Sequence, residues 1–170
     1  MKVASKNCAW IAGLLFAGAA AAQGDAGAAK FLEEAIRGNL AEVRMGELAQ
    51  QRGKSNEARD FGKQLVSDHK MALEKSATLA KELGVRVPTE PSAAASKAYE
   101  MLSKLSGEQF DREFAMHMVM DHRKDIAEYR AAATNGSAPD VASLAKETLP
   151  TLEKHLAAAQ ALEKDLQASR

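Results

Sequence analysis

Four long segments of the sequence carry apolar residues at intervals of three and four, the spacing that gathers them on one helix face. Each segment is rich in Ala, Leu, Glu and Lys, which are strong helix formers. Glycine or proline separates the segments, as at Gly53, Gly84 and Gly136. The four segments are residues 28–51, 55–83, 106–135 and 137–166. Four amphipathic helices of this length predict an all-α protein, a single four-helix bundle.

The connection between the second and third segments is longer than the other two. Pro88 and Pro91 keep its first part extended, and Ser92 is a typical cap for a short helix over residues 92–104. We therefore expect a bundle with a short extra helix in this connection. The length fits either a plain return or a full-length crossover.

Polar residues interrupt the apolar stripes at one position in each long segment. His69, His122 and His155 interrupt the second, third and fourth stripes, and Glu42 interrupts the first. Burial of such groups without partners costs several kcal/mol. All four lie close to the middle of their helices, so they would meet at a similar depth. Three imidazoles and one carboxylate are suitable ligands for one divalent transition-metal ion, Zn, Fe or Cu.

Other polar residues leave alternatives open around this site. Asp68 and Asp121 each precede a histidine and could orient an imidazole on an adjacent helix. Glu47 and Asn39 compete with Glu42 as the ligand from the first segment. His117 is about 140° from His122 around its helix and is expected at the surface. The three stripe histidines would need no metal if they were hydrogen-bonded inside the bundle.

The first 22 residues are typical of a secretory signal peptide. Lys2 and Lys6 precede an apolar run over residues 9–16, and a small-residue tract over residues 17–22 follows. We expect cleavage after Ala22, so that residues 23–170 form the mature single-domain protein. The expected location is the periplasm, with association with the outer membrane left open.

Charge and composition exclude several classes of function. The chain has 23 basic and 23 acidic residues, so loss of Lys2 and Lys6 leaves 21 against 23, a net charge of −2. This balance does not favour nucleic-acid binding. The mature segment has no cysteine, no apolar run that could cross a bilayer, no HExxH motif and no phosphate-binding loop. No catalytic residue is therefore predicted.

Four stretches of the sequence resemble the exported bacterial family called domain of unknown function 4142. The stretches are residues 39–43, 66–70, 110–122 and 149–156, in this order along nearly all of the mature chain. Members are often labelled putative outer membrane proteins and placed in the ferritin-like superfamily. The resemblance implies a ferritin-like four-helix bundle and the same set of Glu42, His69, His122 and His155, but no activity.

The Glu-x-x-His pairs of di-iron ferritin-like sites are absent. Val66, Val119 and Leu152 precede the three histidines by three residues. One metal ion is therefore expected, with a role in metal handling or stress protection. The alternatives are a structural or partner-binding bundle of the cell envelope without metal, and a redox enzyme that uses the metal.

Overall fold

The structure, a computed structural model, describes residues 17–134 and 138–168, with side chains from residue 26 onward. This part of the chain contains five helices and no strand, which confirms the all-α prediction. Within the described ranges, no helix is both long and apolar enough for a membrane span. The helices are α1 (Ala17–Arg52), α2 (Asn56–Glu82), α3 (Ala93–Leu102), α4 (Gly107–Thr134) and α5 (Pro139–Ala168).

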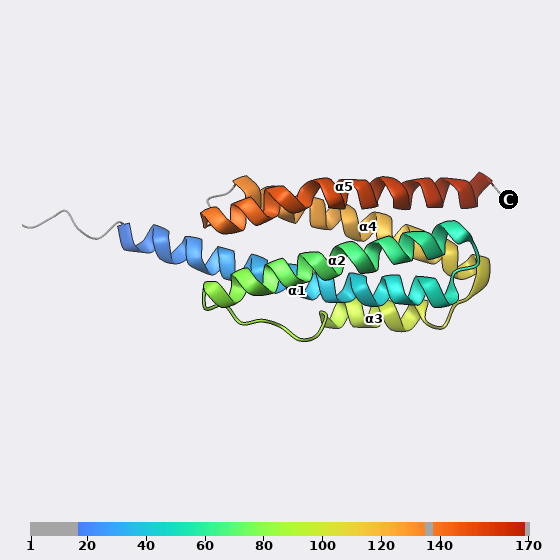
Figure 1. The fold of residues 1–170 in the computed structure, drawn as a ribbon, viewed down its shortest axis with the longest axis horizontal. Coiled ribbons are helices and arrows are strands. Elements are labelled where there is room, and N and C mark those ends of the chain that lie inside the picture. The colour runs from blue at the N-terminus through green and yellow to red at the C-terminus, as the bar shows by residue number, and fades with distance from the viewer. Residues whose placement is uncertain (1–16, 135–137, 169–170) are drawn as a thin grey trace, which may run out of the picture.

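Two helical hairpins pack side by side to form the bundle (Figure 1). One hairpin is α1 with α2 and the other is α4 with α5, while α1 also contacts α4 and α2 contacts α5. Helices α2 and α4 run in the same direction, so the segment that joins them crosses the full length of the bundle. The short helix α3 lies in this crossover and packs on α1 and α4. The sequence left the crossover open, and the structure shows the long form found in ferritin-like folds.

The predicted starts of α2 and α3 and the predicted end of α2 are confirmed. The hydroxyl of Ser55 accepts a hydrogen bond from the Ala58 amide at the start of α2, and Ser92 does the same at the start of α3. Gly84 follows α2 with φ of 67°, a backbone conformation that glycine adopts without strain. Side-chain caps and glycine therefore fix where α2 ends and where α3 begins.

The start of α1 differs from the prediction. The helix begins at Ala17, whereas the sequence indicated a start near residue 28. Alanine has the highest intrinsic helix propensity, so the alanine-rich residues 17–22 continue the helix. Residues 1–16, with most of the expected signal peptide, lie outside the described residues, as does the stop predicted at Asn135–Gly136.

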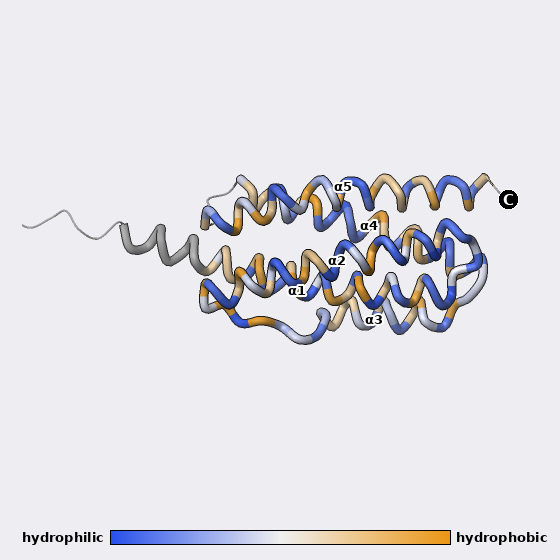
Figure 2. Tube along the Cα trace, viewed as in Figure 1, coloured by the Kyte–Doolittle hydropathy of each residue, from blue (hydrophilic) through white to orange (hydrophobic). Residues whose placement is uncertain are grey.

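The interior has two apolar regions with a polar layer between them. Figure 2 shows hydrophobic and hydrophilic residues alternating along the helices, as expected of helices with one buried face. The region nearest the α1–α2 turn includes Leu48, Phe61 and Phe114. The opposite region includes Ile36 and Val141, with a further adjoining cluster. All four long helices change from apolar to polar residues at the layer between these regions.

Two glycines bring α1 and α2 together beside the polar layer. A Cβ atom at Gly46 would lie 2.5 Å from the Gly62 carbonyl oxygen, and one at Gly62 would lie 2.6 Å from the Gly46 oxygen. Neither position has room for a side chain. The pair therefore sets the close approach of α1 to α2 one turn from Glu42.

Candidate metal centre

Three histidines from three helices meet in the polar layer. His69 of α2, His122 of α4 and His155 of α5 are 4%, 0% and 0% exposed. One ring nitrogen from each lies within 4.8 Å of the others. The structure thus brings together three of the four residues that the sequence predicted as metal ligands.

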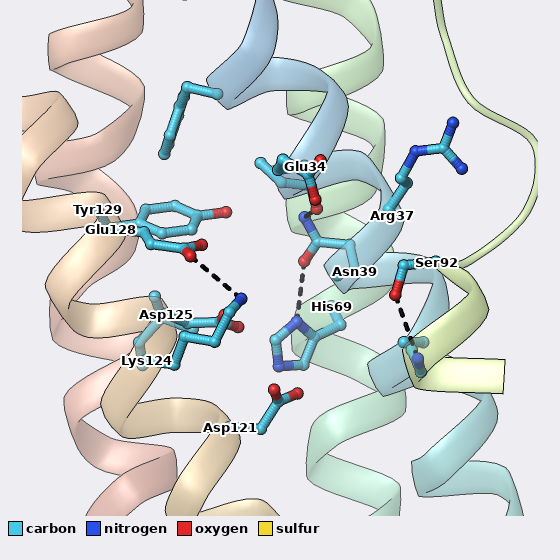
Figure 3. Close-up of a pocket in the computed structure, with 16 residues that line it drawn as sticks. Glu34, Arg37, Asn39, His69, Ser92, Asp121, Lys124, Asp125, Glu128 and Tyr129 are labelled. Atoms are coloured by element: carbon cyan, nitrogen blue, oxygen red, sulfur yellow. Dashed lines mark hydrogen bonds and ion pairs between the residues drawn. The ribbon is translucent and has the colours of Figure 1, made fainter. Parts of the chain in front are cut away.

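One ring nitrogen of each histidine is bonded to a residue outside the cluster and is called its outer nitrogen. The outer nitrogen of His69 is bonded to Asn39 of α1. The Asn39 amide nitrogen donates to the Ala35 carbonyl at 2.8 Å, which turns its amide oxygen toward His69 (Figure 3). That oxygen is 2.8 Å from His69 Nδ1 and can only accept, so Nδ1 carries the proton. His69 Nε2 is buried and has no hydrogen-bond partner among the described residues. A lone pair on Nε2 is therefore left free inside the bundle.

The other two histidines are fixed in the same way. His122 Nδ1 is 3.0 Å from the Met118 carbonyl oxygen, and His155 Nε2 is 2.9 Å from Asp68 Oδ2. Both oxygens are acceptors, so these nitrogens are the protonated ones. The lone pairs then lie on Nε2 of His122 and Nδ1 of His155. These two nitrogens are 3.3 Å apart.

Two facing lone pairs repel each other unless a proton or a cation lies between them. Nitrogen ligands bound at about 2.0–2.1 Å in tetrahedral geometry are about 3.3–3.4 Å apart. The 3.3 Å separation of the two nitrogens has this value. The orphaned His69 Nε2 is the third donor, so the residues present fit a transition-metal ion.

The environment keeps the imidazoles neutral, as metal binding requires. Burial, followed by the charge of His155, lowers the pKa of His122 to about 4. Burial also lowers the pKa of His69 well below its usual value. The pKa of His155 is lowered because the effect of burial exceeds the opposing effect of its hydrogen bond to Asp68. No proton therefore competes for these lone pairs at neutral pH.

Glu42 of α1 lies in the same layer, where its interacting neighbours are two other carboxyl groups, Asp121 and Asp125. The residue is 1% exposed, and neither carboxylate oxygen accepts a hydrogen bond within the described residues. Burial, and then the nearby charge of Asp121, raise the pKa of its carboxyl group well above the ordinary value. Glu42 is not part of the group of donor atoms within 4.8 Å. Its role as the fourth ligand stays a prediction.

The other residues considered from the sequence have distinct positions. Asp68 makes the expected contact with an imidazole of another helix, whereas Asp121 lies near Glu42 without a recorded hydrogen bond to an imidazole in the described chain. Glu47 is exposed and lies 3.5 Å from Lys70, so it is no core ligand. His117 is half-buried and lies outside the histidine cluster.

Two residues of this site have roles that the sequence did not predict. Asn39 was considered only as an alternative ligand, but the structure shows that it orients His69. Asp125 lies in the pocket beside the site, one turn after His122 on α4. In both cases the available signal was a polar residue in an apolar stripe one turn from a predicted ligand.

The profile of the family described as domain of unknown function DUF4142 matches residues 15–162. The chain belongs to this family. The match spans α1, α2, α4 and most of α5, and with them Glu42 and the three clustered histidines. No curated protein matches the chain in sequence.

Two solved structures share the fold of this DUF4142 protein. A DUF305 fragment from Deinococcus radiodurans is 15% identical, with a TM-score of 0.69 over 84% of this chain and 96% of that one. CopM, solved in a Cu(II)-bound form, is 16% identical, with a TM-score of 0.68 over 81% of this chain and 95% of that one. At these identities the likeness establishes the helical-bundle fold alone.

Proposed function

We propose that this DUF4142 protein binds one transition-metal ion in the core of its bundle. His69 Nε2, His122 Nε2 and His155 Nδ1 would be the nitrogen ligands, and Glu42 would supply the oxygen ligand. One observation carries the proposal. Three neutral imidazoles converge, and the outer nitrogen of each donates a hydrogen bond to an oxygen atom outside the cluster. The lone pairs of His122 Nε2 and His155 Nδ1 then face each other, and only a cation or an added proton between them removes their repulsion.

The buried negative charge of Glu42 also supports a bound cation. A buried carboxylate without a hydrogen-bond donor is costly, and a cation beside it removes that cost. With three neutral imidazoles and one carboxylate, a divalent ion would leave a net charge of +1 in the layer. The ion would order the four helices around one point, so bound metal should raise the stability of the fold.

The donor set suits Zn, Fe or Cu. Imidazole nitrogen is a ligand for all three metals, so it does not choose between them. The shared fold with CopM, which has been solved with Cu(II), supports copper as one candidate. The proposed role is metal handling or stress protection.

Elemental analysis of purified protein tests the proposal. After exposure to each metal and removal of excess ion, we expect one ion per chain for the wild type. His69→Ala, His122→Ala and His155→Ala should each lose the ion, whereas His117→Ala, which changes the histidine outside the cluster, should keep it. A metal-free wild type whose melting temperature is unchanged by chelators would instead support a structural or partner-binding bundle.

The cellular location belongs to the same proposal. The basic start, apolar run and small-residue tract of residues 1–22 support export to the periplasm with cleavage after Ala22. Sequencing the N-terminus of protein recovered from the periplasm and from outer-membrane fractions would test this. A mature chain that begins at Gln23 is the expected result, and an intact N-terminus in the cytoplasm would contradict it.

A further inference from the structure

A polar pocket between α1 and α4 leads from the surface to His69, one of the three clustered histidines (Figure 3). Its volume is about 80 Å³, enough for a few water molecules or an ion with part of its hydration shell. Glu34, Lys124 and Glu128 at its rim are exposed, whereas His69 on its wall is 4% exposed. The pocket thus connects solvent to a buried ligand residue.

The free nitrogen of His69 faces this pocket. Its Nδ1 is bonded to Asn39, and the rest of the ring is turned toward Asp121 in Figure 3. Nε2 has no hydrogen-bond partner among the described residues. A buried nitrogen with a free lone pair at the inner end of a polar pocket indicates a cation that arrives through the pocket.

Carboxylates dominate the wall between the rim and His69. Asp121 and Asp125 are one turn apart on α4. Lys124 is 3.8 Å from Asp125 but lies closer to Glu128, at 3.1 Å, on the outer side. The pocket as a whole is lined by four carboxyl groups and two cationic side chains, so carboxyl groups outnumber cations; these residues are Glu34, Asp121, Asp125, Glu128, Arg37 and Lys124.

We propose that this pocket is the route by which the metal ion enters and leaves the histidine cluster, with Asp121 and Asp125 as its ligands in transit. The inference rests on the proposed metal-binding function. Carboxylate oxygens bind Zn, Fe and Cu less selectively than imidazoles, so they hold an ion in passing. The groove between α2 and α5 is also acidic, through Glu74, Asp140 and Glu147, but no cluster histidine lines it.

Loading kinetics test the role of the two carboxylates. Asp121→Asn/Asp125→Asn is compared with Glu74→Gln/Asp140→Asn, which makes the same charge change in the α2–α5 groove. Metal transfer from a chromophoric chelator is followed by stopped flow. We expect the pocket variant to load about tenfold or more slowly, while the control stays close to wild type. Groups that contact the ion only in transit lower the barrier in both directions, so release should slow equally and Kd should stay unchanged.

A steric variant tests the route without changing charge. Gly38 lines the pocket, and a Cβ there would have only Asp125 Oδ2 within 4 Å, at 4.0 Å. The backbone at Gly38 therefore has room for a Cβ atom, and a leucine side chain is chosen to fill the pocket. The control is Gly27→Leu on the same helix, because a Cβ at Gly27 has no neighbour within 4 Å. We expect Gly38→Leu to slow loading and release about tenfold, with one ion still bound at equilibrium, and Gly27→Leu to have no effect.

The outcomes separate this inference from the proposed function. A wild-type chain that binds no ion would overturn both. One ion per chain with wild-type loading rates in Gly38→Leu would overturn the route alone. Weaker equilibrium binding with an unchanged loading rate in the aspartate variant would also overturn it, because Asp121 and Asp125 would then hold the bound ion in place.

Discussion

Two buried carboxylates of this bundle, Asp111 and Glu42, have opposite surroundings although each is 1% exposed. Asp111 of α4 lies at the end of the bundle beside the α1–α2 turn. Its two oxygens accept hydrogen bonds from the backbone amides of Lys54 and Ser55 at 2.9 and 2.8 Å. Glu42 lies in the middle of the bundle, and neither of its oxygens accepts a hydrogen bond in the described structure.

The comparison separates a structural charge from a candidate ligand. Asp111 fastens the start of α2 to α4 and has a donor for each oxygen, so its burial is compensated. Glu42 and His69 Nε2 have no hydrogen-bond partner among the described residues, so their burial is compensated only when a ligand arrives. A buried polar group that the fold leaves unsatisfied marks the place where a cation is expected.

The largest expected effect is the loss of stability when Asp111, the structural carboxylate of this comparison, is replaced. Asp111→Ala leaves two backbone amides without an acceptor, and each hydrogen bond to a charged group contributes about 1.5–3 kcal/mol. We expect the free energy of unfolding to fall by about 3–5 kcal/mol in denaturant titrations, with one metal ion still bound by the folded protein. The control Glu108→Ala removes an exposed carboxylate that pairs with Lys54 and should cost less than about 1 kcal/mol. Equal losses for the two variants would contradict the comparison.

A pH titration of the metal-free protein should have the next largest effect. The pKa of His122 is about 4 in the folded chain and about 6.5 when unfolded, so the unfolded state binds more protons between these values. The free energy of unfolding should therefore fall as pH drops from 6.5 to 4, by about 3 kcal/mol from His122. Denaturant titrations of wild type and His122→Leu at several pH values isolate this contribution. The same pH dependence in both proteins would show that His122 is not buried in the neutral form.

A smaller effect, on metal affinity, is expected for Asp68, the carboxylate that is hydrogen-bonded to the proposed ligand His155. Asp68→Asn keeps an acceptor for His155 Nε2 but removes its charge, which lowers the basicity of Nδ1. We expect metal affinity in competition titrations to fall about 10–100-fold. Asp60→Asn changes an exposed carboxylate on the same helix, paired with Lys63, and should leave the affinity unchanged. A wild-type metal affinity in Asp68→Asn would show that the charge of Asp68 does not contribute to metal binding.

The smallest expected effect has the opposite sign. Because the pKa of Glu42 is raised on folding, its ionisation opposes folding once the pH exceeds the unfolded value. Glu42→Gln should therefore stabilise the metal-free protein at pH 7, by about 1 kcal/mol, and weaken metal binding. Glu47→Gln, at an exposed position of the same helix, is the control. A metal-free Glu42→Gln protein that is less stable than wild type would show that Glu42 has a structural partner, as Asp111 does.

Much of the fold was predictable because it depends on local patterns. The spacing of apolar residues indicated the four long helices, and Ser55, Ser92 and Gly84 marked their boundaries. The full-length crossover was not predictable, because a segment of this length with a helix in it fits either connection. The start of α1 was predicted wrongly, since the alanines of residues 17–22 have the same high helix propensity as alanines elsewhere in the chain.

The site was predictable in its residues and not in its details. A histidine in an apolar stripe is visible in sequence, and three of them indicated the cluster. Which nitrogen faces inward depends on Asn39, Met118 and Asp68, and these contacts exist only after the helices pack. Asp111 also lies in an apolar stripe, beside Phe110 and Phe114, yet it serves the fold. Sequence pattern alone does not distinguish these two uses of a buried polar residue.

The most direct test of the central claim is an anomalous-scattering map from crystals of the metal-loaded protein. The account predicts one metal peak in the bundle core, bonded at about 2.0–2.2 Å to His69 Nε2, His122 Nε2 and His155 Nδ1. It also predicts that Asn39, the Met118 carbonyl and Asp68 keep their contacts with the outer nitrogens. A core without a peak, or a metal bound only at the surface, would contradict the claim.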